Sequence, residues 1–341
     1  MESRKLASGR VMSREQQELL SKRINELPLT IKGSYLEACV AKLYQEMERA
    51  GICFKPKTYL TDGWGCPDKV PVIGIPFYLA DQELCSLQAE LNDTSPVRNE
   101  VETMMVLRHE AGHAFNYAYR LYVKPEWRQL FGPFSQPYKD IYVPVPFSLR
   151  FVHHSSGWYA QKHPDDDFAE TFAVWLTPGT EWRRQYDGTP ALAKLLYVDR
   201  MARKYGQQPP AVTDGKLDMP LQEMTMTLDE WYEKLRESSH VDVPLHNVLN
   251  NDLRRLFPAE EGESAADVLL DNRTELIQEV NHWTGMDRSL LTALIDELVR
   301  RVQLLELKIK PEEVHAQMLS TSVFVTTLVM NHLCRGRFVD I

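Results

Sequence analysis

The chain has 341 residues, of which 43% are hydrophobic and 10% aromatic, and its formal net charge is −9. This composition supplies enough apolar side chains for one or two domains. The acidic balance and the lack of a Lys/Arg-rich block argue against a nucleic-acid partner, no glycine-rich phosphate loop occurs, and no apolar run reaches the roughly 20 residues of a membrane helix.

The cysteines and the start of the chain indicate a reducing compartment. The five cysteines are scattered and form no C-x-x-C pair, so the sequence predicts neither a disulfide framework nor a zinc ribbon. The first ten residues, MESRKLASGR, lack the apolar centre of a signal peptide. We therefore expect a cytoplasmic protein.

The first part of the chain is predicted to contain helices followed by short strands. Residues 1–16 are polar and are expected to form a flexible tail, whereas residues 19–48 carry apolar side chains at helical spacing. Between residues 53 and 80 the composition changes to β-branched and aromatic residues around an Asp-Gly-Trp-Gly turn. The prolines in this stretch favour an edge strand.

Two longer helices are predicted next. The first begins near Asn92 to Pro96, where a capping side chain is followed by proline, and it runs to about residue 119. The second begins at Pro164 with three aspartates and ends before Thr177-Pro178-Gly179. These elements predict an α+β domain over residues 17–190, with a small mixed sheet packed on the first helix.

Residues 191–341 are predicted to form a mainly α-helical accessory domain. Three segments, residues 265–283, 287–308 and 311–333, carry apolar side chains at helical spacing. This pattern favours the core of a small bundle. The alternative is that the domain binds a protein partner.

The sequence His109-Glu110-Ala111-Gly112-His113 lies well inside the first long helix. Two histidines four residues apart lie on one helical face, where both can bind a single tetrahedral metal ion. Glu110 is the next residue round the helix, and its carboxylate can accept a proton from water and later deliver it to a leaving amine. The motif therefore predicts zinc-dependent hydrolysis.

A third ligand must come from elsewhere in the chain. The longer motif of the metzincins would need glycine and histidine where this chain has Asn116 and Tyr119. The thermolysin pattern E-x-x-x-D fails as well, because Val174 stands four residues after Glu170. Glu170 lies inside the second helix, and its carboxylate completes a His₂Glu site.

Around Glu170 the chain reads YAQKHPDDDFAETFA from Tyr159 to Ala173. With the HEAGH motif, this stretch resembles a family of bacterial zinc-binding metallopeptidases. These are gluzincin-like proteins with H-E-x-G-H followed by Y-A-x-x-H-P-x-x-D-F-A-E. The resemblance covers about residues 108–176. The chain is similar, more distantly, to the catalytic domain of anthrax lethal factor.

The resemblance implies a zincin-like fold with one Zn²⁺ bound by His109, His113 and Glu170. It also implies that Glu110 is the general base and that Tyr159 donates a hydrogen bond to the oxyanion of the tetrahedral intermediate. This chain departs from the family in two respects. The N-terminal zinc ribbon of many relatives is missing, and the long C-terminal helical part has no counterpart that we can match.

Four further residues are candidates for supporting roles. Asp166 and Asp167 precede Glu170 by about one helical turn, so either can hold a ligand histidine in place, and Asp167 is favoured because it fills the family's D-F-A-E position. Helix capping is the alternative for both. His163 is a candidate for substrate binding, with packing or helix capping as the alternatives. Gly74, in the possible edge strand 72–77, allows close approach of an extended peptide.

The sequence thus predicts a zinc metallopeptidase that acts on a peptide or protein substrate. Two alternatives stay open. The zinc site can be structural or regulatory in a non-proteolytic protein, or the same ligands can serve a zinc amidase acting on a modified peptide.

Overall fold

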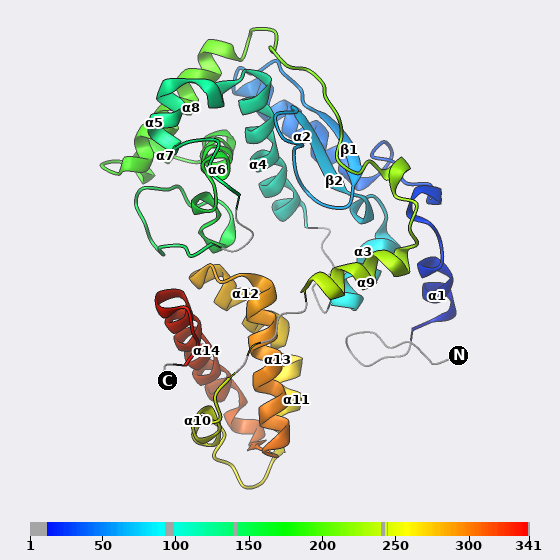
Figure 1. The fold of residues 1–341 in the computed structure, drawn as a ribbon, viewed down its shortest axis with the longest axis vertical. Helices are drawn as coiled ribbons and strands as arrows, with labels where there is room; N and C mark the ends of the chain where they lie inside the picture. Colours follow the sequence, from blue (N-terminus) through cyan, green and yellow to red (C-terminus); the bar gives the residue numbers. More distant parts are fainter. Residues whose placement is uncertain (1–11, 93–98, 139–141, 240–242, 244, 340–341) are drawn as a thin grey trace. The chain divides into compact units, whose positions relative to one another are not determined.

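The structure is a computed structural model that describes residues 12–92, 99–138, 142–239, 243 and 245–339. The chain folds into two compact units (Figure 1). Unit 1 consists of Met1–Lys139, Phe147–Ser155 and Tyr159–Lys234, and unit 2 consists of Asp140–Pro146, Ser156–Trp158 and Leu235–Ile341. The sequence prediction ended the first domain at residue 190, whereas unit 1 continues to Lys234.

The N-terminal segment is ordered earlier than the sequence prediction expected. Helix α1 (Arg14–Leu20) begins inside the stretch that we expected to be a tail, because Ser13 and Gln16 form a reciprocal capping box. The Ser13 hydroxyl accepts from the Gln16 backbone N–H, and the Gln16 amide oxygen accepts from the Ser13 N–H. The expected tail before residue 12 lies outside the described residues.

A helix and two strands form the next layer of unit 1. Helix α2 (Tyr35–Arg49) is capped by the Ser34 hydroxyl and has a fully buried apolar face. Strands β1 (Lys57–Thr61) and β2 (Val72–Pro76) pair in parallel, and helix α3 (Gln82–Asn92) follows. Figure 1 shows the strands beside α2 and α4. All five residues of β2 are buried.

The centre of unit 1 is a pair of closely packed helices, α4 (Glu100–Ala118) and α6 (Pro164–Leu176). Asn99 caps α4 through its side chain, whereas residues 93–98, where the sequence placed the helix start, are outside the described part. Gly112 lies against the backbone of Ala169, where an added Cβ would be only 2.7 Å from the Ala169 Cα. Glycine is therefore required for this close approach.

The remaining helices of unit 1 include α5 (Pro125–Phe131), α7 (Trp182–Gln185) and α8 (Pro190–Tyr205). Helix α9 (Leu228–Ser239) begins in unit 1 and continues past Lys234, the last residue of that unit. Both α5 and α8 contact α6. Because α8 packs against the helix that carries the candidate site residues, the unit extends past residue 190.

Unit 2 is a helical assembly with its own apolar core. Its helices are α10 (Leu249–Leu256), α11 (Ala265–Asp271), α12 (Arg273–Thr284), α13 (Arg288–Leu304) and α14 (Val314–Arg335). Two short strands, β3 (Glu263–Ser264) and β4 (Lys308–Ile309), pair antiparallel. Leu294, Leu298 and Val302 of the predicted apolar stripe are buried in this core, as the helical spacing indicated.

The described structure is mostly helical, with two small two-stranded sheets, and is consistent with the predicted α+β class. Besides its parallel pairing with β1, strand β2 forms an antiparallel bridge through Gly74 with Gly65, which lies outside the named strands. None of the helices in the described ranges has the length and apolar character needed to span a membrane.

Candidate metal centre

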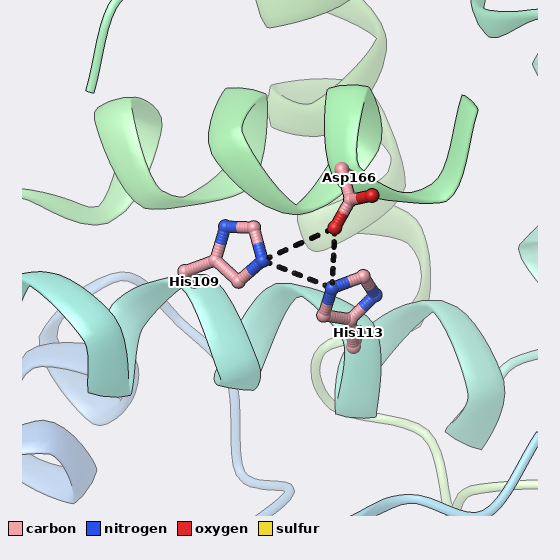
Figure 2. A group of neighbouring side chains, drawn as sticks. All are labelled: His109, His113 and Asp166. Carbon is pink, nitrogen blue, oxygen red and sulfur yellow. Dashed lines mark hydrogen bonds and ion pairs between the residues drawn. The ribbon is translucent and has the colours of Figure 1, made fainter. Parts of the chain in front are cut away.

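Two histidines and an aspartate meet between α4 and α6 (Figure 2). The Nε2 atoms of His109 and His113 lie 3.0 Å apart, and the Asp166 Oδ1 lies 3.6 Å from each of them. The histidines are one turn apart on α4, and Asp166 is in the first turn of α6. All three side chains are largely buried.

The other nitrogen of each imidazole contacts a second carboxylate. The Nδ1 of His109 lies 2.8 Å from the Glu170 Oε1, and the Nδ1 of His113 lies 2.8 Å from the Asp165 Oδ2. An ionised carboxylate can only accept, so each Nδ1 carries the proton and donates. In the neutral imidazoles both Nε2 lone pairs then point at each other and at Asp166.

This convergence of three electron-rich atoms fits a metal ion. Tetrahedral nitrogen and oxygen ligands at 2.0–2.1 Å from zinc lie about 3.3 Å from one another. The observed separations, 3.0 Å and 3.6 Å, bracket that value. The second oxygen of Asp166 is buried without a hydrogen-bond partner among the described residues. His109, His113 and Asp166 can therefore hold a divalent cation.

The supporting carboxylates are themselves held by several donors. Glu170 accepts from the Ser155 backbone N–H at 2.8 Å and from the Ser155 hydroxyl at 2.7 Å. Asp165 accepts from the Asn116 side-chain amide at 2.7 Å and from the Tyr117 hydroxyl. Such carboxylates fix the orientation and the tautomer of a metal-binding imidazole.

The arrangement differs from the sequence prediction for Glu170. The sequence named Glu170 as the third ligand, but in the structure its carboxylate lies on the Nδ1 of His109 and is not part of the group around the two Nε2 atoms. Asp166, predicted only for support, takes that place. The reason is geometric: Asp166 and Glu170 are one turn apart on α6, so Asp166 lies 3.6 Å from both Nε2 atoms while Glu170 lies beside the Nδ1 of His109.

Without a metal ion, protons must neutralise this cluster. Burial alone would lower the pKa of His109, but hydrogen bonds to Asp166 and Glu170 outweigh it and raise the pKa to about 9. Burial would also lower the pKa of His113, but the carboxylates of Asp165 and Asp166 outweigh this effect and raise it well above the ordinary value. The imidazoles in turn hold the pKa of Asp166 below its usual range, against the effect of its burial. Positive charge is thus favoured between these groups.

Asp167, the favoured supporting residue in the sequence prediction, does not contact either histidine. Its Oδ2 accepts from the Lys194 ammonium at 2.6 Å, and that ammonium also donates to the Arg150 carbonyl at 2.8 Å. Burial raises the pKa of Asp167 to about 7, although Lys194 opposes the shift. Asp167 therefore joins α6 to α8. The contact with His113 belongs to Asp165, which the sequence analysis placed only among the three aspartates at the start of the helix.

His163 is a helix cap in this structure. Its Nδ1 accepts from the Asp165 backbone N–H at 3.1 Å, and its Nε2 donates to the Gln136 carbonyl at 2.9 Å. Both ring nitrogens are thus occupied by backbone groups. The side chain also borders the cavity described next, but its hydrogen bonds correspond to the capping alternative.

Glu110 faces a cavity of about 590 Å³ that the three metal-binding candidates also line. Its Oε2 is buried and has no hydrogen-bond partner in the described part of the chain. Burial raises the pKa of this carboxyl. The Cys66 thiol lines the same cavity and donates to the Glu110 backbone carbonyl at 3.3 Å. The Glu110 Oε2 is therefore available to exchange a proton with a molecule in the cavity.

Two tyrosines, Tyr138 and Tyr159, line the cavity. The Tyr159 ring packs edge-on against the His109 ring, with 5.5 Å between centroids. Its hydroxyl lies 3.3 Å from the hydroxyl of Tyr138. The sequence analysis did not identify Tyr138, because it comes from a Pro/aromatic-rich connection with no periodic pattern. Burial and then the Asp166 carboxylate raise the pKa of both phenols, so both remain hydrogen-bond donors.

Gly74 serves chain packing instead of an open edge. Its N–H donates to the Gly65 carbonyl at 2.7 Å, and its carbonyl accepts from the Gly65 N–H at 3.3 Å. A Cβ at this position would lie 2.7 Å from the Thr61 Cγ2. The outer edge here is therefore the segment Trp64–Cys66, which lines the cavity.

Comparison with known proteins identifies no relative. No protein-family model, no curated protein and no solved structure matches the chain. The resemblance to zinc metallopeptidases thus depends on the motif residues themselves.

Proposed function

We propose that this protein is a zinc-dependent peptidase with a zincin-like catalytic domain, and that His109, His113 and Asp166 hold its metal ion. The observation that carries the proposal is the convergence of two imidazole Nε2 atoms and one carboxylate oxygen, each imidazole being fixed by a carboxylate on its far nitrogen. Imidazole and carboxylate ligands in a three-residue site are typical of catalytic zinc.

The chain supplies the groups that peptide hydrolysis needs around that ion. When bound, zinc supplies Lewis acidity, which acidifies a water molecule and polarises a carbonyl. Glu110 would take a proton from that water at its unpartnered Oε2 and deliver it to the leaving amine nitrogen. Tyr159 would donate a hydrogen bond from its phenol to the carbonyl oxygen as negative charge develops there.

A free backbone edge beside the cavity favours a peptide as substrate. Gly65 and Gly74 exchange both of their hydrogen bonds, so the backbone groups of Trp64 and Cys66 point away from β2. Those groups have no hydrogen-bonding partner within the described ranges. An extended peptide would pair with this edge, as peptides do at exposed strand edges.

The open cavity favours catalysis over a purely structural zinc site. Structural zinc is normally closed by four protein ligands, whereas here three candidate ligands and Glu110 border a space of about 590 Å³. The amidase alternative uses the same groups and differs only in the substrate. The resemblance to the zinc metallopeptidase family and the cytoplasmic location are expectations from the sequence, and we include both in this proposal.

The test is a peptide-library screen with the zinc-loaded full chain. Wild type should hydrolyse one or more peptides, and Glu110→Gln should keep its zinc while its turnover falls about 100-fold or more. Glu102→Gln, an exposed glutamate on the same helix, is the matched control and should remain fully active.

Three results would contradict the proposal. One is a wild-type protein that binds no stoichiometric zinc, and another is a Glu110→Gln variant with wild-type turnover. The third is a zinc-loaded protein that cleaves no peptide. In that last case, Glu110-dependent cleavage of peptidoglycan-like fragments would favour the amidase, and no cleavage at all would favour the non-proteolytic protein.

A further inference from the structure

A second phenol, that of Tyr138, lies in the cavity beside Tyr159. The Tyr138 hydroxyl is 3.3 Å from the Tyr159 hydroxyl, and both side chains line the cavity with His109, His113 and Asp166. Two hydroxyls at this separation can both reach one oxygen atom placed between them. Tyr138 comes from the connection after α5, so the two phenols approach from different segments.

A positive charge accompanies the two phenols. The Lys162 ammonium lies over both rings, 4.7 Å from the Tyr138 centroid and 5.1 Å from the Tyr159 centroid. An ammonium near a phenol makes its O–H a stronger hydrogen-bond donor, and it also favours negative charge nearby. The surroundings of the pair therefore suit an anionic oxygen.

The neighbours of Tyr138 define its position. Its ring packs on His163 with 5.4 Å between centroids, and His163 is itself fixed by Gln136 and by the first turn of α6. The Tyr138 side chain is nevertheless 54% exposed. It is thus placed at the rim of the cavity, where substrate can reach it.

We propose that Tyr138 is a second catalytic phenol, which donates a hydrogen bond to the same developing oxyanion as Tyr159. This inference rests on the proposed peptidase function. It assigns a role to a residue that the motif and the family resemblance leave out. No proton or electron leaves Tyr138 in this step, because the phenol only donates a hydrogen bond that strengthens as charge forms.

The test compares two inhibitors that differ in the oxyanion. A peptide phosphonate carries charged oxygens on a tetrahedral phosphorus, whereas a peptide thiol with the same side chains binds the metal through sulfur and has no such oxygens. Tyr138→Phe removes one hydroxyl and keeps the ring. We expect phosphonate binding to weaken about 10- to 100-fold and thiol binding to stay within about twofold. Zinc content should be unchanged.

Tyr122→Phe is the matched control. Tyr122 belongs to the neighbouring aromatic cluster, with its ring 4.5 Å from that of Phe134, but it does not line the cavity. This variant should bind both inhibitors like wild type. Tyr138→Phe that binds the phosphonate as tightly as wild type, or that weakens both inhibitors equally, would overturn the role of Tyr138.

Hydrolysis by the same proteins separates this inference from the proposed function. If wild type cleaves peptides, Glu110→Gln does not, and Tyr138→Phe is unaffected, then the role of Tyr138 is rejected and the peptidase function is kept. A wild-type protein that cleaves no peptide and binds neither inhibitor rejects both the peptidase and the role of Tyr138.

Discussion

The Glu170 carboxylate lies 2.8 Å from the Nδ1 of His109, on the side of the ring that faces away from His113. Because Ser155 holds this carboxylate through two further hydrogen bonds, the imidazole has one orientation and one tautomer. Its Nε2 lone pair is then directed at the position between the helices. A carboxylate that acts in this way prepares a metal ligand without binding the metal itself.

We expect Asp165 to fix the orientation and the tautomer of His113, as Glu170 does for His109. The Asp165 carboxylate accepts from His113, Asn116 and Tyr117. In Asp165→Asn one carboxylate oxygen becomes an amide that donates instead of accepting. One of these hydrogen bonds is then lost, and His113 is held less firmly. We expect zinc affinity to fall about 10- to 100-fold, measured by competition with a chelating indicator. Asp187→Asn, an exposed aspartate of the same unit, should leave it unchanged. Equal affinity in the two variants would refute this role.

Asp167 should matter for stability and not for metal binding. Asp167→Asn removes the charge that faces the buried Lys194 ammonium, and we expect the free energy of unfolding to fall by about 1–3 kcal/mol. Zinc affinity should stay close to that of wild type, because Asp167 contacts neither histidine. Chemical denaturation and the same zinc competition measure the two effects. A loss of zinc affinity as large as that of Asp165→Asn would contradict the assignment.

Gly112 should be intolerant of even one added carbon. In Gly112→Ala the Cβ would lie 2.7 Å from the Ala169 Cα and 2.9 Å from the Ala169 carbonyl oxygen. These are backbone atoms, so α4 and α6 must separate. We expect the free energy of unfolding to fall by about 1–3 kcal/mol, even though alanine favours a helix by about 1 kcal/mol over glycine.

Gly63→Ala is the control for this overpacking. A Cβ at Gly63 meets no heavy atom within 4 Å, so its stability should change by less than about 0.5 kcal/mol. If Gly112→Ala were as stable as Gly63→Ala, the close contact between the two helices would not be a constraint on the fold.

The metal-free protein should lose stability as the pH rises through the neutral and mildly alkaline range. Although burial acts in the opposite direction, Asp166 and Glu170 raise the pKa of His109 from 6.5 to about 9. The folded chain therefore holds a proton that the unfolded chain releases. This stabilisation is complete below pH 6.5 and is lost as the pH rises through about 9.

Thermal unfolding of chelator-treated protein at several pH values measures this effect. The unfolding temperature should fall across that window, and zinc-loaded protein should show a much smaller fall, because a bound cation replaces the proton between the neutral imidazoles. A metal-free unfolding temperature that is constant or rises across the window would contradict the electrostatic description of the cluster.

The sequence predicted the parts of the site that depend on local helical geometry. The pair His109 and His113 follows from spacing alone, and a helix beginning at Pro164 follows from its proline and aspartates. The choice between Asp166 and Glu170 does not, because they lie on one helical face and only the offset between α4 and α6 decides which of them reaches the two Nε2 atoms.

Other features depend on contacts between distant segments. Gly65 pairs with Gly74 through a single antiparallel bridge, and no sequence pattern around either residue predicts this pairing. Tyr138 reaches Tyr159 through an irregular connection, for which neither helical nor strand periodicity gives a position. The early start of α1, in contrast, was present in the sequence as the pair Ser13 and Gln16, a capping signature within a polar stretch.

The most direct test of the metal centre compares the zinc dissociation constants of Asp166→Asn and Glu170→Gln. Glutamine can still accept from the His109 Nδ1, so Glu170→Gln should weaken zinc binding about 10- to 100-fold. Asp166→Asn replaces an anionic ligand oxygen with a neutral amide and should fail to retain stoichiometric zinc after dialysis. The reverse order, with Glu170→Gln losing its zinc and Asp166→Asn keeping it, would contradict the centre of His109, His113 and Asp166.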